Sequence, residues 1–321
     1  MNKPNNNLSK ISQPSLENIL KHGIDAVVCS SGYESRSSYL AKKLFSYSPL
    51  RFCIGHAEKR EIAARIKNDE IYESLGFACK ELSGDSSSGA QQLLLDILLK
   101  INKPECHLVL DISSMTRAWY GGFVHALATQ KLISKVLVDY LYVPSKFQRI
   151  YDKVLPNETS GPLEGFFGLA PADLPTALVM CLGSEPRRSI GIVEELDPTR
   201  KIVFYANPSV DDKYVTEALE VNKDILKRTD ESNIFTFPVR DSVGLLSNLE
   251  SLCSGLMKHY RVVLTSMGPK IFSLCCFIVA SQYPEISVWR ITTGTHGDPI
   301  DHQPTDEIIS LEVEWSSLES K

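Results

Sequence analysis

The feature that most constrains the fold is an alternation of short apolar segments with amphipathic segments, which runs through the chain twice. The apolar segments are rich in Val, Ile, Leu and Cys, as buried strands are. The segments between them place apolar residues every three to four positions, which is the spacing of one helix face. Strands that alternate with helices in this way are typical of an α/β protein with a parallel, doubly wound sheet. The sequence therefore predicts two such sheets in tandem.

The two halves match element by element, which favours an internal duplication. The expected strands are 25–29, 51–54, 77–82, 107–110 and 135–143 in the first half, and 177–182, 201–206, 234–238, 261–264 and 286–291 in the second. The turn at 32–36 (Gly-Tyr-Glu-Ser-Arg) resembles that at 183–187 (Gly-Ser-Glu-Pro-Arg), and Arg117 corresponds to Lys270. Each half has the usual length of a domain. The alternative is that any two Rossmann-like domains share this element order.

The same segmentation predicts the domain boundaries. Residues 1–15 are polar and are expected to form a disordered tail, followed by a first Rossmann-like domain over 16–150. Residues 151–176 are rich in Pro and Gly, so we expect them to connect the halves, and their apolar side chains indicate that they pack on one domain. A second Rossmann-like domain is expected over 177–321.

Composition excludes several classes of function. A chain of 321 residues is long enough for two domains, and a net charge of −5 does not favour binding to the nucleic-acid backbone. No apolar run is long enough to cross a bilayer, and the N-terminus lacks the apolar core of a signal peptide. The eight cysteines form no Cys-x-x-Cys pair, so we expect reduced thiols in a cytoplasmic protein. No motif points to a metal ion or a cofactor, and no known catalytic motif is present.

Residues 107–117 are the strongest candidate for a ligand loop. An apolar strand over 107–110 is followed by Asp111-Ile112-Ser113-Ser114-Met115-Thr116-Arg117, after which a mostly apolar helix begins. A helix N-terminus presents free backbone N–H groups and a positive dipole end, which favour a phosphate. Arg117 can add a bidentate contact, and Asp111 can accept a ribose hydroxyl. Alternatively, the hydroxyls only cap the helix and Asp111 only orders the turn.

A second loop is expected to face this one. If each sheet has the strand order 3-2-1-4-5, its first and fourth strands are neighbours, and the loops that follow them open onto one crevice where such sheets bind ligands. The expected ligand-binding residues of the first half are Ser31, Gly32, Glu34, Arg36, Asp111, Ser113, Ser114, Thr116 and Arg117. Their expected equivalents in the second half are Gly183, Glu185, Arg187, Ser266 and Lys270. The competing interpretation is that Glu34 simply pairs with Arg36 or Arg117.

Residues 109–117 resemble the ligand loop of CRISPR-associated Rossmann-fold (CARF-like) sensor domains. In that family, a strand-end Asn/Asp-x-Thr-Gly-Gly-x-Lys pattern contacts the phosphates of cyclic oligonucleotides. Ser113, Ser114 and Arg117 stand for its Thr, Gly and Lys, although the Gly-Gly pair is absent. The resemblance implies that residues 30–32 form the other ligand loop, and that the chain is a sensor or accessory protein of antiviral defence.

We therefore expect a protein that binds a nucleotide or a similar phosphorylated small molecule, with protein partners from a defence operon and with a homodimer as a possible assembly. One alternative is an enzyme of nucleotide hydrolysis or glycosyl transfer that uses Glu34 or Asp111 as its acidic group, with His296 as a candidate acid or base. Another is a scaffold subunit in which the second half has lost ligand binding. Pro186 and Pro269 in the second-half loops fit that alternative.

Overall fold

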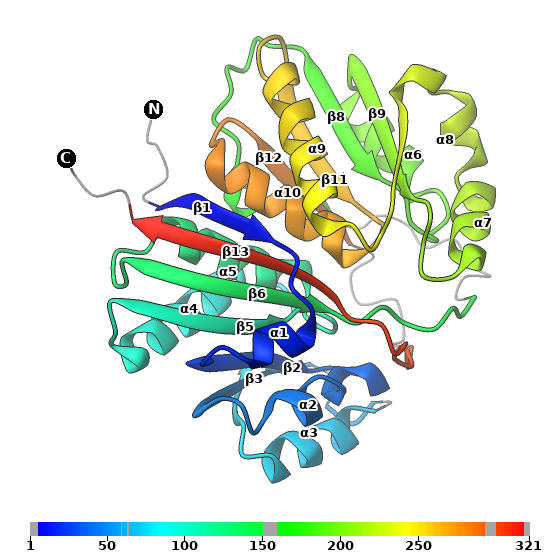
Figure 1. Ribbon diagram of the computed structural model, residues 1–321. Helices are drawn as coiled ribbons and strands as arrows, with labels where there is room; N and C mark the ends of the chain where they lie inside the picture. Colours follow the sequence, from blue (N-terminus) through cyan, green and yellow to red (C-terminus); the bar gives the residue numbers. More distant parts are fainter. Residues whose placement is uncertain (1–5, 59, 63, 150–158, 293–299, 318–321) are drawn as a thin grey trace. The chain divides into compact units, whose positions relative to one another are not determined.

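The computed structural model describes residues 6–58, 60–62, 64–149, 159–292 and 300–317, and it contains two α/β units (Figure 1). The first unit comprises the described residues of 6–146 and 300–317, and the second those of 147–292. A seven-stranded sheet and a six-stranded sheet form their centres, and both are mostly parallel. The predicted α/β class with two Rossmann-like sheets is therefore confirmed. In the described part of the chain, no helix is both long and apolar enough to cross a membrane.

The first unit follows the predicted alternation and adds a strand at each end of the chain. Its elements are β1 (Asn6–Ser12), α1 (Leu16–Leu20), β2 (Ala26–Ser31), η1 (Ser35–Ser38), α2 (Ala41–Leu44), β3 (Leu50–His56), α3 (Arg65–Ser74), β4 (Ala78–Leu82), α4 (Ser87–Ile101), β5 (Glu105–Asp111), α5 (Arg117–Thr129), β6 (Lys135–Tyr142) and β13 (Ile309–Ser317). The sheet order is β1-β13-β6-β5-β2-β3-β4. The five predicted strands thus have the order 3-2-1-4-5, and β2 lies beside β5 in parallel register.

Apolar side chains cover both faces of this sheet, as a doubly wound fold requires. On one face, Ile19, Leu44 and Tyr72 bring α1, α2 and α3 onto Cys29 and Cys53. On the other face lie α4 and α5 (Figure 1). The α5 side chains Trp119 and Phe123 are fully buried. Both faces of the sheet at β2 and β5 are therefore covered by packed helices.

The two ends of the described chain differ from the sequence prediction. Residues 6–12 form the edge strand β1 and not a disordered tail, and residues 309–317 pair with both β1 and β6, so they belong to the first unit. The β13 strand alternates apolar Ile309, Leu311, Val313 and Trp315 with polar residues, which is the two-residue period of a strand. Assigning all of 177–321 to a second domain placed this strand on the wrong sheet, because strand pairing is set by tertiary contacts and not by chain order.

The second unit repeats the same order. Its elements are β7 (Thr159–Phe167), β8 (Thr176–Cys181), α6 (Arg188–Leu196), β9 (Arg200–Ala206), α7 (Asp212–Val221), α8 (Lys223–Lys227), η2 (Glu231–Asn233), β10 (Ile234–Phe237), α9 (Ser242–Leu256), β11 (Arg261–Ser266), α10 (Lys270–Gln282) and β12 (Ser287–Thr292). The sheet order is β10-β9-β8-β11-β12-β7, which again gives 3-2-1-4-5 for the predicted strands.

The segment predicted as a connection contributes a strand of its own. Residues 159–167 form β7, which pairs antiparallel with β12 at the edge of the second sheet. Leu163 and Phe166 are buried there, and the ring of Phe166 lies 5.0 Å from that of Phe277 of α10, tilted by 50°. The expectation that this segment packs on one domain holds for its described part. Residues 150–158 lie outside the described residues.

The repeat extends to matching contacts between helices. α4 and α9 both contain 15 residues, and their N-cap side chains, Ser86 and Asp241, accept a hydrogen bond from the N–H of a glycine three residues later. In the first unit, a Cβ at Gly122 of α5 would lie 2.6 Å from the carbonyl oxygen of Ser87. In the second unit, Cys275 of α10 contacts the carbonyl of Ser242, the residue that corresponds to Ser87. The two halves therefore share packing geometry as well as element order.

Candidate nucleotide-binding loops

The loop after β2 is held in place by side chains from η1 and α3. The N–H of Gly32 donates to Ser37 Oγ at 2.8 Å. The Asn68 amide of α3 donates to the carbonyl oxygens of Gly32 and Glu34, at 3.0 and 2.9 Å. Tyr72 donates to the carbonyl oxygen of Ser37 at 2.7 Å. Because these donors and acceptors are buried, the loop has a defined conformation before any ligand arrives.

The loop after β5 is ordered by its own polar side chains. Asp111 Oδ1 accepts the N–H of Ser113 at 2.9 Å, and Ser113 Oγ accepts the N–H of Val143 at the end of β6, also at 2.9 Å. Thr116 is the N-cap of α5, where its Oγ1 accepts the N–H of Trp119. The contacts of Asp111 and Thr116 are those of the alternative interpretation, in which they shape the turn and cap the helix. Arg117 is the first residue of α5, as the sequence predicts.

The structure brings the two loops together at the neighbouring strands β2 and β5. A Cβ built on Gly32 would lie 3.1 Å from Ser114 Cβ, so the absence of a side chain at Gly32 allows this approach. Ser114 Oγ donates to Glu34 Oε2 at 3.3 Å. Gly32, Glu34 and Ser114, three of the residues predicted for the site, therefore lie side by side.

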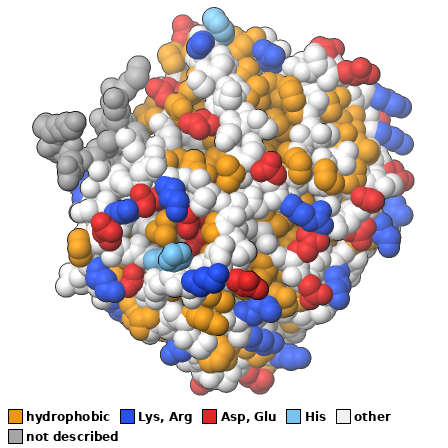
Figure 2. Space-filling model, in the orientation of Figure 1, with side chains coloured by type: hydrophobic (Ala, Val, Ile, Leu, Met, Phe, Trp, Pro, Cys, Tyr) orange, Lys and Arg blue, Asp and Glu red, His pale blue; other side chains and the backbone are white. Residues whose placement is uncertain are grey.

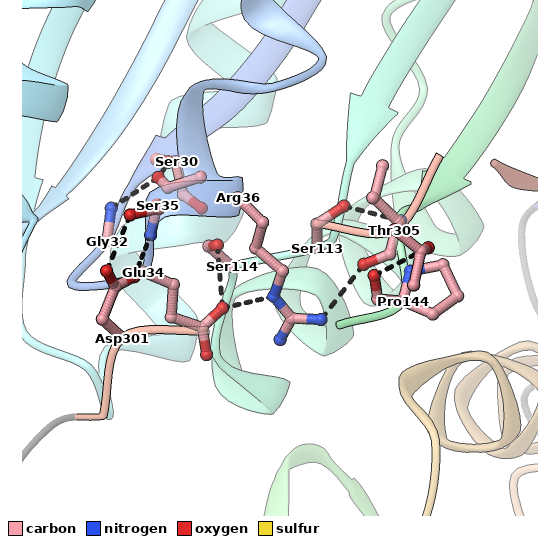
Figure 3. A network of polar contacts seen from close by, with 12 residues as sticks. Ser30, Gly32, Glu34, Ser35, Arg36, Ser113, Ser114, Pro144, Asp301 and Thr305 are labelled. Carbon is pink, nitrogen blue, oxygen red and sulfur yellow. Dashed lines mark hydrogen bonds and ion pairs between the residues drawn. The ribbon is translucent and has the colours of Figure 1, made fainter. Parts of the chain in front are cut away.

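A buried ion pair lies at the centre of these loops. The Arg36 guanidinium is 6% exposed, forms an ion pair with Glu34, and donates to the carbonyl oxygen of Val143 at 3.0 Å (Figure 3). Burial opposes the charge of Arg36, but Glu34 and Tyr142 stabilise it, so its pKa is raised overall. The pairing of Glu34 with Arg36, which the sequence left as an alternative, is thus present. It orients Glu34, which also accepts from Ser114.

The charges of both Arg36 and Arg117 act on the buried Tyr142 hydroxyl, and nothing in the sequence singled Tyr142 out. Burial raises the pKa of its hydroxyl, while the charges of Arg36 and Arg117 oppose that increase. The net pKa lies above its ordinary value, so the hydroxyl is protonated at neutral pH. Both guanidinium groups therefore act on one buried hydroxyl at the carboxyl edge of the sheet, with Glu34 beside them.

A segment from the far end of the chain covers the loop after β2. Asp301 accepts both the N–H and the hydroxyl of Ser35, the latter at 2.7 Å, and the carbonyl of His302 accepts the N–H of Arg36 at 3.1 Å (Figure 3). Thr305 donates to the carbonyl of Pro144 through its N–H and its hydroxyl. Asp301 and Ser35 are 266 positions apart, so no local pattern in the sequence indicates their contact.

The second unit contains the same ion pair with a different arginine. Arg188 binds Glu185 and donates to the carbonyl oxygen of Ile291 in β12, as Arg36 binds Glu34 and Val143. Arg187, the residue predicted to correspond to Arg36, is exposed and has a φ of +63°. The match by position was wrong by one residue, because the helix after β8 starts with Arg188 and turns that side chain inward. Asn222 donates to the carbonyl of Gly183 at 2.8 Å, as Asn68 does to Gly32.

The loops of the second unit are packed more tightly than those of the first. A Cβ at Gly183 would lie 1.8 Å from the carbonyl oxygen of Met267, and one at Gly268 would lie 2.7 Å from that of Leu182. Lys270 is the first residue of α10, and the hydroxyl of Ser266 is buried without a hydrogen-bond partner among the described residues. Backbone therefore fills the position where a ligand would approach the main chain of Gly183.

The remaining candidate from the sequence is His296. His296 lies outside the described residues. Over those residues, no three His, Cys, Asp or Glu side chains are grouped as metal ligands. Basic and acidic side chains are interspersed over the face shown in Figure 2, without an extended area of one sign. Comparison of the chain with models of protein families and with curated proteins finds no match.

Proposed function

We propose that the loops after β2 and β5 bind a phosphorylated small molecule of the nucleotide class. The observation that carries this proposal is the meeting of the two loops at Gly32, Ser114 and Glu34, beside the start of α5, at the point where β2 and β5 are neighbours. In open α/β sheets with this strand order, ligands bind outside the carboxyl ends of these two strands. One cation at the start of a helix, a carboxylate and several hydroxyls suit a ligand with both phosphate and ribose.

The contacts of each residue suggest its role. Arg36 is committed to Glu34 and Val143, so it positions Glu34 and does not reach for the ligand. Arg117 begins α5, a helix of 13 residues, whose first N–H groups and dipole attract a phosphate. Ser114 and Glu34 then lie where they can bind ligand hydroxyls. This division makes Arg117 the principal contact of the phosphate.

We assign ligand binding to the first unit. In its loops, Gly32 faces the side chain of Ser114, and a Cβ at Gly32 would lie 3.1 Å from Ser114 Cβ. In the second unit, Gly183 faces the backbone of Met267 at a much shorter distance. The second unit then serves as a scaffold. The likeness of residues 109–117 to CARF-like ligand loops supports a role as a sensor or accessory protein in antiviral defence, with a cyclic or linear oligonucleotide as one ligand to examine.

Thermal shift against a panel of mononucleotides, cyclic oligonucleotides and inorganic phosphate tests this proposal. We expect at least one nucleotide to raise the melting temperature of the wild type and Arg117→Ala to abolish that increase. Lys42→Ala, which removes an exposed cation from α2, is the matched control and should retain the shift. A shift that persists in Arg117→Ala, or a panel without any shift, would contradict the proposed site. Mass spectrometry of molecules that co-purify with the protein would identify the ligand.

A further inference from the structure

Three cysteines form a row across the outer strands of the first sheet. Cys29 of β2 is directly opposite Cys53 of β3, and Cys53 is directly opposite Cys79 of β4. Paired residues of neighbouring strands point to the same face, so the three side chains are adjacent. β4 is the edge strand. The row therefore runs from the core to the surface, with Cys29 and Cys53 buried and Cys79 the one exposed cysteine of the eight.

The surroundings of Cys79 favour its thiolate. A hydrogen bond from the Cys53 thiol lowers the pKa of Cys79 more than burial raises it. The Arg65 guanidinium also lowers this pKa, while the carboxylates of Asp69 and Glu73 raise it. The outcome is a pKa below the ordinary value for cysteine. Burial holds the pKa of Cys53 well above its ordinary value, so Cys53 keeps its proton. Cys79 therefore has the lower pKa of a nucleophilic thiol, and Cys53 has the higher pKa of a thiol that reacts second.

The spacing of the strands permits a bond between these two sulfur atoms. Neighbouring strands lie about 4.8 Å apart, and disulfides join Cα atoms about 4.4–6.8 Å apart. Since β4 has a paired neighbour on one side only, it can adjust more readily than an inner strand. Cys79 is itself exposed at this edge of the sheet, which gives a small molecule access to its sulfur.

We propose that Cys79 and Cys53 form a peroxide-reactive thiol pair. The Cys79 thiolate attacks one oxygen of a hydroperoxide, so that an S–O bond forms, the O–O bond breaks, and hydroxide or alkoxide leaves with a proton from water. Cys53 sulfur then attacks the sulfenic acid of Cys79. An S–S bond forms, the S–O bond breaks, and the proton of Cys53 leaves with the hydroxide as water. Two thiols are oxidised and one hydroperoxide is reduced.

Alkylation and intact-mass measurements on the full chain test this pair. With the reduced protein, N-ethylmaleimide should label Cys79 well before any other cysteine. After treatment with hydrogen peroxide that labelling should disappear, the mass should fall by about two units for the loss of two hydrogens, and dithiothreitol should reverse both changes. A non-reducing digest should join the peptide that contains Cys53 to the one that contains Cys79.

Single substitutions separate the two roles. Cys79→Ser should abolish both the labelling and the loss of mass, while Cys53→Ser should stop the oxidation of Cys79 at a sulfenic acid that dimedone traps. Cys253→Ser, which removes a buried thiol from α9, is the matched control and should behave as the wild type. Accumulation of a sulfinic acid at Cys79 of the wild type without a disulfide would overturn the proposal. If Cys53→Ser does not fold, the digest of the wild type decides the question, because a missing or different cross-link refutes the pair.

Discussion

At the scale of the residue, the clearest result is that one buried arginine performs the same structural task in each half. Arg36 and Arg188 each bind a glutamate of the loop after the first strand and donate to a carbonyl oxygen near the end of the fifth strand. This contact ties the loop to an element more than 100 positions away. Removal of such a side chain leaves a carboxylate and a carbonyl without their donor.

We expect Arg36→Ala to lower the free energy of unfolding by about 3 kcal/mol, as breaking a buried ion pair does. Arg187→Ala is the control, because that side chain is exposed, and a surface substitution changes stability by less than about 0.5 kcal/mol. Urea unfolding followed by fluorescence measures both. Equal effects of the two substitutions would show that Arg36 does not hold the loop.

Glycine is required where the two loops of the second unit touch. Gly183→Ala would place a Cβ 1.8 Å from the carbonyl oxygen of Met267, and since backbone cannot yield as a side chain does, we expect a loss of about 2 kcal/mol or more. Gly255→Ala in α9 has open space, and we expect it to stabilise the protein by up to about 1 kcal/mol, because alanine favours a helix. Melting temperatures of the two variants should therefore shift in opposite directions.

At the scale of the element, β13 joins β1 to the rest of the first sheet through main-chain pairing and through Glu312. That carboxylate is 6% exposed and binds Lys10 and Ser12 of β1. Burial raises the pKa of Glu312, but the contacts with Lys10 and Ser12 lower it more, so that the pKa in the folded protein is below its ordinary value. The charged form of Glu312 is thus the one that stabilises the pairing of β1 with β13.

This shift predicts how stability depends on pH. A carboxylate whose pKa is lowered by folding contributes stability above its unfolded pKa of about 4.5, and the contribution is lost as the pH falls through the folded pKa. Glu312→Gln should therefore be less stable than the wild type at pH 7, by about 1–2 kcal/mol for a charge-assisted hydrogen bond. The difference should shrink as the pH falls below the unfolded pKa and through the folded one. Glu17→Gln, at an exposed position of α1, is the surface control in parallel urea titrations.

At the scale of the whole molecule, the two units differ in how they are built from the chain. The second unit is continuous over its described residues, whereas the first takes its sixth and seventh strands, β13 and β1, from segments far apart in sequence. β13 pairs with β1 on one side and with β6 on the other. The first unit is therefore complete only when β13 is in place.

Ending the chain after Asp298 should affect the two units unequally. Loss of β13 removes the partner of β1, leaves the edge of β6 unpaired, and uncovers the core that Trp315 packs against. We therefore expect amide protection in β5 and β6 to fall sharply. The amides of β8 and β11 should stay protected. Hydrogen exchange followed by mass spectrometry of peptides distinguishes the units. Unchanged protection of β6 in the shortened chain would show that β13 is dispensable for the first unit.

The sequence by itself determined the α/β class and the ten parallel strands, because local apolar runs and helical spacing carry that information. The 3-2-1-4-5 order was a supposition that followed from the doubly wound class, and the two sheets confirm it. The sequence also placed Arg117 and Lys270 at the starts of their helices. The tertiary structure alone decided that β1 and β13 join the first sheet, and that the second-unit counterpart of Arg36 is Arg188 and not Arg187. It also decided that Asn68 and Asp301 hold the loop after β2, and that the charge of Arg36 acts on Tyr142. These contacts join residues far apart in the chain, and a long-range contact depends on the packed arrangement of both partners rather than on the pattern around either.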